Sequence, residues 1–235
     1  MKKWIYALSV LAAAGIIALK LSGNENFDMI YSIFRAAAFA LIFVVVLCFK
    51  KAVRLGDKDA LFTGMLGLCI ITVSEIYSLV YSIVSNEQYG LHIGDYSDAG
   101  SYLFFLTAIA LLLLPPVKLE RFLRIGVGAF SCLVIVLTIY SVTANNEKVL
   151  YMTVVGTAAV CAGLSAWLFC QSRKIKMLKT AVCFALSMLF LGVLDIGLYL
   201  LKYFELSYWH GVFSPLYLLS FLFIGDGLLR LRKEE

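Results

Sequence analysis

Apolar residues run along the chain in eight long stretches, each separated from the next by a short polar or turn-forming segment. A helix needs about 20 apolar residues to cross a bilayer, and the eight stretches approach or exceed that length. Lipid offers the backbone no hydrogen-bond partner, so each stretch is expected to be helical and to end at the polar break that follows it. The predicted spans cover roughly residues 4–22, 28–49, 60–84, 100–116, 121–143, 149–170, 177–203 and 207–229.

Basic residues gather at alternate ends of these spans. Cytoplasmic ends of membrane helices carry an excess of Lys and Arg. With the N-terminus in the cytoplasm, 16 of the 20 basic residues lie on the cytoplasmic side, and an odd number of spans would break this alternation. The sequence therefore predicts an all-α, polytopic transmembrane helix bundle of eight spans with both termini cytoplasmic. The outer side receives only Lys20, Lys148 and Lys202, and Arg35 lies inside a span.

The whole chain, residues 1–235, is expected to form a single integral membrane domain. Its first stretch could also be a secretory signal, but an apolar run of about 18 residues is longer than such signals usually have, so a retained span is favoured. No connection is longer than about 14 residues, which leaves no room for a separate soluble catalytic domain. The distribution of charge suits a bacterial inner membrane, and a protein of the endoplasmic reticulum would look similar.

Composition narrows the class further. Hydrophobic residues make up 62% of the chain and charged residues 15%, and the mean hydropathy is +0.93. These values exclude a soluble domain, a disordered chain and a disulfide-stapled secreted scaffold. The net charge of +5 comes from the ends of the spans and does not indicate a nucleic-acid partner. The six cysteines form no C-x-x-C pair, so they are interpreted as small buried hydrophobes, and neither a metal nor a cofactor is expected.

Four ionisable residues lie inside the predicted spans, where such groups are costly and mark function by default. At 1.5 Å per residue, Arg35, Glu75 and Asp195 lie about 10, 14 and 12 Å from the outer ends of their helices. Three charged groups on three helices thus share one depth, which predicts that they meet. Asp226 lies near the cytoplasmic end of the last span, and an ion pair at the surface with Arg230, four residues later, is its expected role.

Polar neighbours at helical spacing suggest a pocket around these charges. Ser78 follows Glu75 on one helix face, Tyr199 follows Asp195, and His210, Ser214 and Tyr217 follow the spacing i, i+4, i+7 in the last span. The candidate catalytic residues are Glu75 and Asp195. The candidate substrate-binding residues are Arg35, Ser78, Tyr199, His210, Ser214 and Tyr217.

Two interpretations of the charged group remain open. Arg35 could form a buried ion pair with Glu75 or Asp195 that only fixes the register of the helices. Alternatively, the same residues could line an aqueous cavity. One cation against two carboxylates leaves an excess acid, and two carboxylates in a site of low dielectric constant cannot both ionise cheaply. A protonated acid beside an ionised base is what acid/base hydrolysis requires.

The pattern resembles the lysoplasmalogenase-like (YhhN) family of eight-span membrane proteins. That family has a Lys followed by Pro in the second span, where this chain has Arg35-Ala36. It has Gly-Asp in the third span and Ser-Asp in the seventh. Its last span is rich in Tyr and ends in a Gln that has no counterpart here. The corresponding residues of this chain are Ser74-Glu75, Leu194-Asp195 and, near the family's Tyr, Tyr217.

The resemblance implies a membrane hydrolase that cleaves the vinyl ether bond of a lysoplasmalogen, a single-chain ether lipid. Vinyl ether hydrolysis needs one acid to protonate carbon and one carboxylate to stabilise the cation or activate water. Glu75 and Asp195 are expected to divide those tasks, and the apolar spans to hold the alkenyl chain. The alternative is a non-catalytic receptor, transporter subunit or lipid-binding module, and in either case the partner is a membrane lipid or small molecule.

Overall fold

A computed structural model describes residues 3–23, 27–49, 58–85, 93–113, 120–171, 178–204, 209, 212–213 and 216–231. These residues contain no strand. They form eight helices, of which six are long and apolar enough to cross a membrane, so the described chain is that of an all-helical membrane protein. The helices are α1 (Lys3–Leu21), α2 (Phe27–Phe49), α3 (Lys58–Ser85), α4 (Ile93–Leu113), α5 (Glu120–Thr143), α6 (Glu147–Gln171), α7 (Leu178–Tyr203) and α9 (Tyr217–Arg230).

Two of the predicted spans begin at the wrong residue. α4 starts at Ile93 and not at residue 100, because a helix entering the membrane can carry the polar side chains of Asp95, Ser97 and Asp98 that a search for apolar residues excludes. α9 starts at Tyr217, ten residues after the predicted start of the last span. Pro215 precedes it in the sequence, and proline lacks the N–H and clashes with the carbonyl four residues earlier, so it interrupts a helix.

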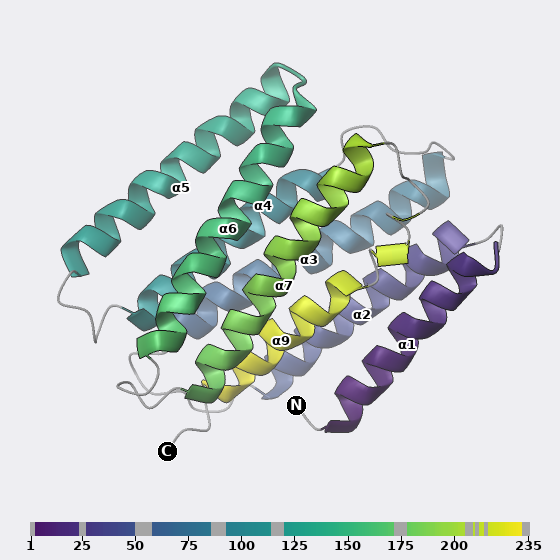
Figure 1. Ribbon diagram of the computed structural model, residues 1–235, viewed down its shortest axis with the longest axis horizontal. Coiled ribbons are helices and arrows are strands. Elements are labelled where there is room, and N and C mark those ends of the chain that lie inside the picture. Colours follow the sequence, from purple (N-terminus) through teal and green to yellow (C-terminus); the bar gives the residue numbers. More distant parts are fainter. Residues whose placement is uncertain are drawn as a thin grey trace.

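Six helices form a closed ring in the described part of the chain. α2 packs against α3, α3 against α4, α4 against α6, α6 against α7, α7 against α9, and α9 against α2. The other two helices lie outside the ring, at opposite margins of the bundle in Figure 1: α1 beside α2 and α9, and α5 beside α4 and α6. α1 begins and α9 ends at the same end of the bundle, called here the terminal end (Figure 1).

The packing pattern repeats itself in the two halves of the chain. Let α1 correspond to α5, α2 to α6, α3 to α7 and α4 to α9. The contact of α2 with α3 then corresponds to that of α6 with α7, and the contact of α3 with α4 to that of α7 with α9. In the same way, the contact of α5 with α4 corresponds to that of α1 with α9, and the contact of α4 with α6 to that of α9 with α2. The helices are thus arranged as two four-helix units with approximate two-fold symmetry.

Close packing in the ring depends on Gly67 of α3. A Cβ atom added there would lie 2.7 Å from Cε1 of Phe105, a ring on α4 that is fully buried. We expect Gly67→Ala to lower the free energy of unfolding by about 1–3 kcal/mol, because overpacking a filled core shifts its side chains. Thermal unfolding in detergent measures the change. Gly156→Ala is the matched control: its Cβ would meet nothing within 4 Å, so a loss of similar size there would show that packing on Phe105 is not the cause.

Candidate functional site

The ion pair expected from the sequence forms between α2 and α3. A guanidinium nitrogen of Arg35, Nη2, donates to Oε1 of Glu75. The Glu75 side chain is 10% exposed and that of Arg35 34%, so the carboxylate is the buried partner. Arg35 also lies 5.4 Å from the ring centre of Tyr31, which is one turn earlier on α2 and holds the cation over its π-face. Arg35 and Glu75 therefore neutralise each other within one unit of the ring.

Asp195 on α7 has different partners, both tyrosines. The hydroxyl of Tyr102 on α4 donates to Oδ2 of Asp195 at 2.9 Å. The hydroxyl of Tyr217, the first residue of α9, contacts the hydroxyl of Tyr102 and also interacts with the Asp195 carboxylate. Tyr102 is fully buried. A carboxylate and two phenols from three helices thus form one partly buried, hydrogen-bonded cluster.

Asp98 lies one turn before Tyr102 on α4, near enough to Arg35, Tyr102 and Tyr217 for an electrostatic interaction with each. We call the six residues of these two groups and Asp98 the polar layer: Arg35, Glu75, Asp98, Tyr102, Asp195 and Tyr217. They belong to five of the six ring helices.

An aromatic floor lies one turn closer to the terminal end than this layer. The ring of Phe221, four residues after Tyr217, meets the ring of Phe39 edge-on at 4.8 Å and that of Phe105 at 6.2 Å. All three rings are at most 2% exposed. These three rings border the polar layer on its side nearer the terminal end.

The remaining sequence-predicted residues fall in two groups. Ser78 is half-buried one turn beyond Glu75 on α3, away from the terminal end. The side chain of Tyr199, and His210 and Ser214 as a whole, lie outside the described residues. Tyr102 and Asp98 were missed by the sequence analysis, because the predicted fourth span began at residue 100 and tyrosine is common in apolar helices. The polar residues spaced four apart at 94–102 were the signal that could have found them.

Asp226 lies inside the protein, contrary to the expectation of a surface position. It accepts a hydrogen bond from Nε of Arg230 at 2.9 Å, which confirms the pairing of these residues, but its exposed fraction is only 1%. Cys183 of α7 packs beside it, with Sγ 3.7 Å from Oδ2. Burial follows because α9 lies in the ring against α7, and this pair is remote from the polar layer, more than two turns from Tyr217.

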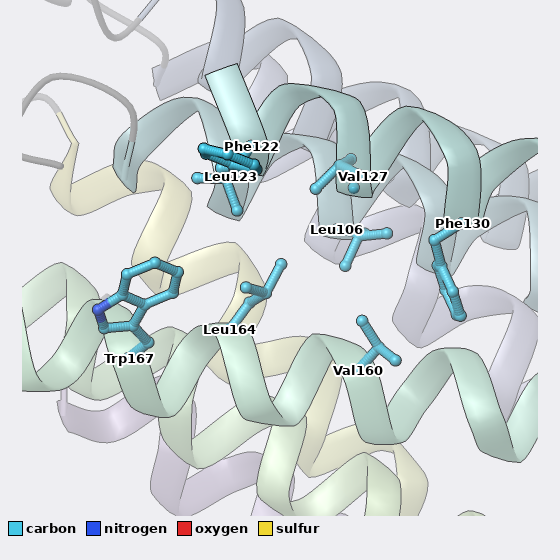
Figure 2. A pocket seen from close by; sticks show the side chains of 9 residues that line it. Leu106, Phe122, Leu123, Val127, Phe130, Val160, Leu164 and Trp167 are labelled. Carbon is cyan, nitrogen blue, oxygen red and sulfur yellow. The ribbon is translucent and has the colours of Figure 1, made fainter. Parts of the chain in front are cut away.

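An open apolar groove of about 350 Å³ lies elsewhere, between α5 and α6. Figure 2 shows Phe122, Leu123 and Val127 of α5 facing Leu164 and Trp167 of α6, with Leu106 of α4 behind them. Leu106 is one turn from Tyr102, about 6 Å along the helix axis. The groove and the polar layer thus share one helix. The groove is lined by Leu106, Phe122, Leu123, Gly126, Val127, Phe130, Val160, Leu164 and Trp167.

Comparison of the chain with protein-family models, with curated proteins and with solved structures finds no match in any of the three. The resemblance to the lysoplasmalogenase-like family therefore stays a prediction from the sequence.

Proposed function

We propose that the protein is a membrane-embedded hydrolase that cleaves the vinyl ether bond of a lysoplasmalogen-type lysophospholipid. The observation that carries this proposal is the unequal environment of the two carboxyl groups. Glu75 is paired with a guanidinium, whereas the contacts of Asp195 in the described chain are with two phenols. Two acids whose surroundings differ in this way are suited to different roles in acid/base catalysis.

In the proposed reaction, the Asp195 carboxyl group donates its proton to the second carbon of the alkenyl chain. The first carbon and the ether oxygen then share the positive charge of an oxocarbenium ion, which the Asp195 carboxylate faces. Tyr102 donates a hydrogen bond to that carboxylate, and Tyr217 holds Tyr102 in place through the contact of the two hydroxyls. Water adds to the first carbon and gives its proton to Glu75, which is paired with Arg35. The hydroxyl of the resulting hemiacetal gives its proton to Asp195 while Glu75 returns its proton to the leaving glycerol oxygen. The bond between that oxygen and the first carbon breaks, which releases a fatty aldehyde and the glycerophospho headgroup and restores both acids.

The groove between α5 and α6 is the proposed site of the alkenyl chain. Its volume of about 350 Å³ is at the lower end of the roughly 300–1,000 Å³ of small-molecule sites, and its lining is apolar. The proposal also includes eight spans, cytoplasmic termini and a bacterial inner membrane. These features rest on the positions of 16 basic residues, which all fall on one side of the membrane when the predicted spans are threaded through it.

Filling the groove is expected to weaken substrate binding. A Cβ added at Gly126 meets nothing within 4 Å, so Gly126→Phe places its ring in the groove without displacing the backbone. We expect KM for a lysoplasmalogen to rise roughly tenfold, equivalent to about 1.4 kcal/mol, with little change in kcat. Gly128→Phe is the matched control, because Gly128 is also unobstructed but does not line the groove. Equal KM values for the two variants would remove the groove from the proposal.

The non-catalytic alternative is favoured by one observation, the two-fold arrangement of the helices together with the short last helix α9. Several families of membrane transporters combine repeated units with interrupted helices and bind their substrate at the interface of the repeats. A transporter subunit or ligand-binding module on this bundle would use the same polar layer without cleaving a bond.

Incubation of the purified protein with a lysoplasmalogen separates the two functions. Release of fatty aldehyde that is lost in both Glu75→Gln and Asp195→Asn supports the hydrolase. Saturable binding of the intact lipid without aldehyde, by protein that is monodisperse on size exclusion, supports the binding module and rejects the hydrolase.

A further inference from the structure

The two halves of the chain keep the same register over two consecutive helices. At an offset of 120 residues, Tyr31 of α2 matches Tyr151 of α6, and Val73 and Ile76 of α3 match Val193 and Ile196 of α7. Glu75 and Asp195 are also 120 residues apart, so the two acids occupy the same position of equivalent helices.

Equivalent residues also make equivalent contacts. Phe105 of α4 packs on Gly67 of α3. The residue 120 positions after Gly67 is Ser187 of α7, and its hydroxyl donates to the carbonyl of Ser220 on α9 at 2.7 Å. Ser220 follows Phe105 by 115 residues, the same interval that separates Tyr102 from Tyr217. The two tyrosine hydroxyls, which occupy equivalent positions, contact each other.

One position breaks this symmetry at the polar layer. Arg35 of α2 corresponds, at the same interval of 120 residues, to Val155 of α6, and both are half-buried. Glu75 therefore has a cation supplied by the neighbouring helix, whereas the equivalent residue of α6, the helix packed against α7, is apolar. Among the described residues the polar partners of Asp195 are Tyr102 and Tyr217, and neither carries a positive charge.

We propose that the place beside Asp195 that corresponds to the Arg35 guanidinium is a binding site for the positively charged centre of a ligand. A carboxylate and phenol rings together are a common setting for cations, because the carboxylate supplies charge and the rings supply π-faces. The surrounding helices are apolar, so the ligand class is a single-chain amphiphile with a cationic head. The inference deepens the proposed function and rests on it only for the identity of the cation, which in the reaction is the oxocarbenium ion.

Dodecylamine, which is protonated at pH 7, tests the site without turnover. Native mass spectrometry of the full chain released from detergent counts the molecules bound, and dodecanol serves as the uncharged probe of equal length. We expect one dodecylamine per chain, bound at least about tenfold more tightly than dodecanol.

Val155→Arg is the decisive variant, because it supplies within the chain the cation that Arg35 provides to Glu75. We expect it to weaken dodecylamine binding about tenfold or more, while Val155→Met leaves binding unchanged. Asp195→Asn should have the same effect as Val155→Arg, with Asp59→Asn, an exposed acid at the start of α3, as its control. If Val155→Arg does not fold, the Asp195→Asn and Asp59→Asn pair decides alone.

Equal binding of dodecylamine and dodecanol, or binding unaffected by Asp195→Asn, would overturn the cation site. The outcome is distinguishable from that of the hydrolase proposal. Dodecylamine binding without aldehyde release would keep the cation site and reject hydrolysis, whereas aldehyde release without dodecylamine binding would reject the cation site alone.

Discussion

Asp195→Asn is expected to lower kcat for aldehyde release by about 10²–10⁴-fold, the usual contribution of a general acid. Asparagine has the shape of aspartic acid and can still accept a hydrogen bond from Tyr102, so the cluster of the two tyrosines keeps its geometry. What the amide lacks is a proton that it can donate to carbon and the negative charge that faces the cation. The initial rate of fatty aldehyde formation under saturating lysoplasmalogen measures the change.

Two comparisons separate chemistry from structure in this variant. Tyr102→Phe removes one hydrogen bond to the carboxylate and leaves the acid, so its kcat should fall far less, by roughly tenfold. Asp59→Asn changes an exposed acid on the same bundle and should leave kcat unchanged. An Asp195→Asn protein that retains the rate of the unmodified chain would exclude Asp195 as the acid.

Loss of Arg35 is expected to have the second largest effect, on stability. Arg35→Met leaves the nearly buried Glu75 carboxylate without its cation inside the ring. Removing one partner of a buried ion pair lowers stability by about 3–5 kcal/mol, and the value here should be near 3 because Arg35 retains about a third of its exposure. Unfolding in detergent, followed by circular dichroism against added dodecyl sulfate, measures the change.

The double variant Arg35→Met/Glu75→Met is the control for this prediction. Replacing both members of a buried pair by apolar residues is often neutral or stabilising, so the double variant should regain most of the stability lost by Arg35→Met. A double variant as unstable as Arg35→Met would mean that Arg35 stabilises the bundle through Tyr31 or Asp98 and not through Glu75.

Most of the fold could be predicted from the sequence, because an apolar run in lipid has one way to satisfy its backbone. α5 ends at Thr143, the residue at which the fifth predicted span ends. The start of α4 could not be found in this way, since Asp95 and Asp98 are polar yet helical. The start of α9 could have been found by giving more weight to Pro215.

The candidate site was predictable in depth but not in partners. Helix length places Arg35, Glu75 and Asp195 at one level, and the pairing of Arg35 with Glu75 follows because α2 and α3 are neighbours in the ring. Which group meets Asp195 depends on the order of helices around the ring, and that order places Tyr102 of α4 opposite α7. The repeat is hard to see in the sequence because its two halves share register and contacts while few residues are identical, as Arg35 and Val155 illustrate.

The most direct test of the central claim, carbon protonation by Asp195 in a vinyl ether, is hydrolysis of a lysoplasmalogen in D₂O. The aldehyde is reduced at once to the alcohol and examined by mass spectrometry. The proposed mechanism predicts one solvent deuterium on the second carbon of the chain, formed by the unmodified protein and not by Asp195→Asn. Intact lipid with no aldehyde, or aldehyde carrying no deuterium at that carbon, would contradict it.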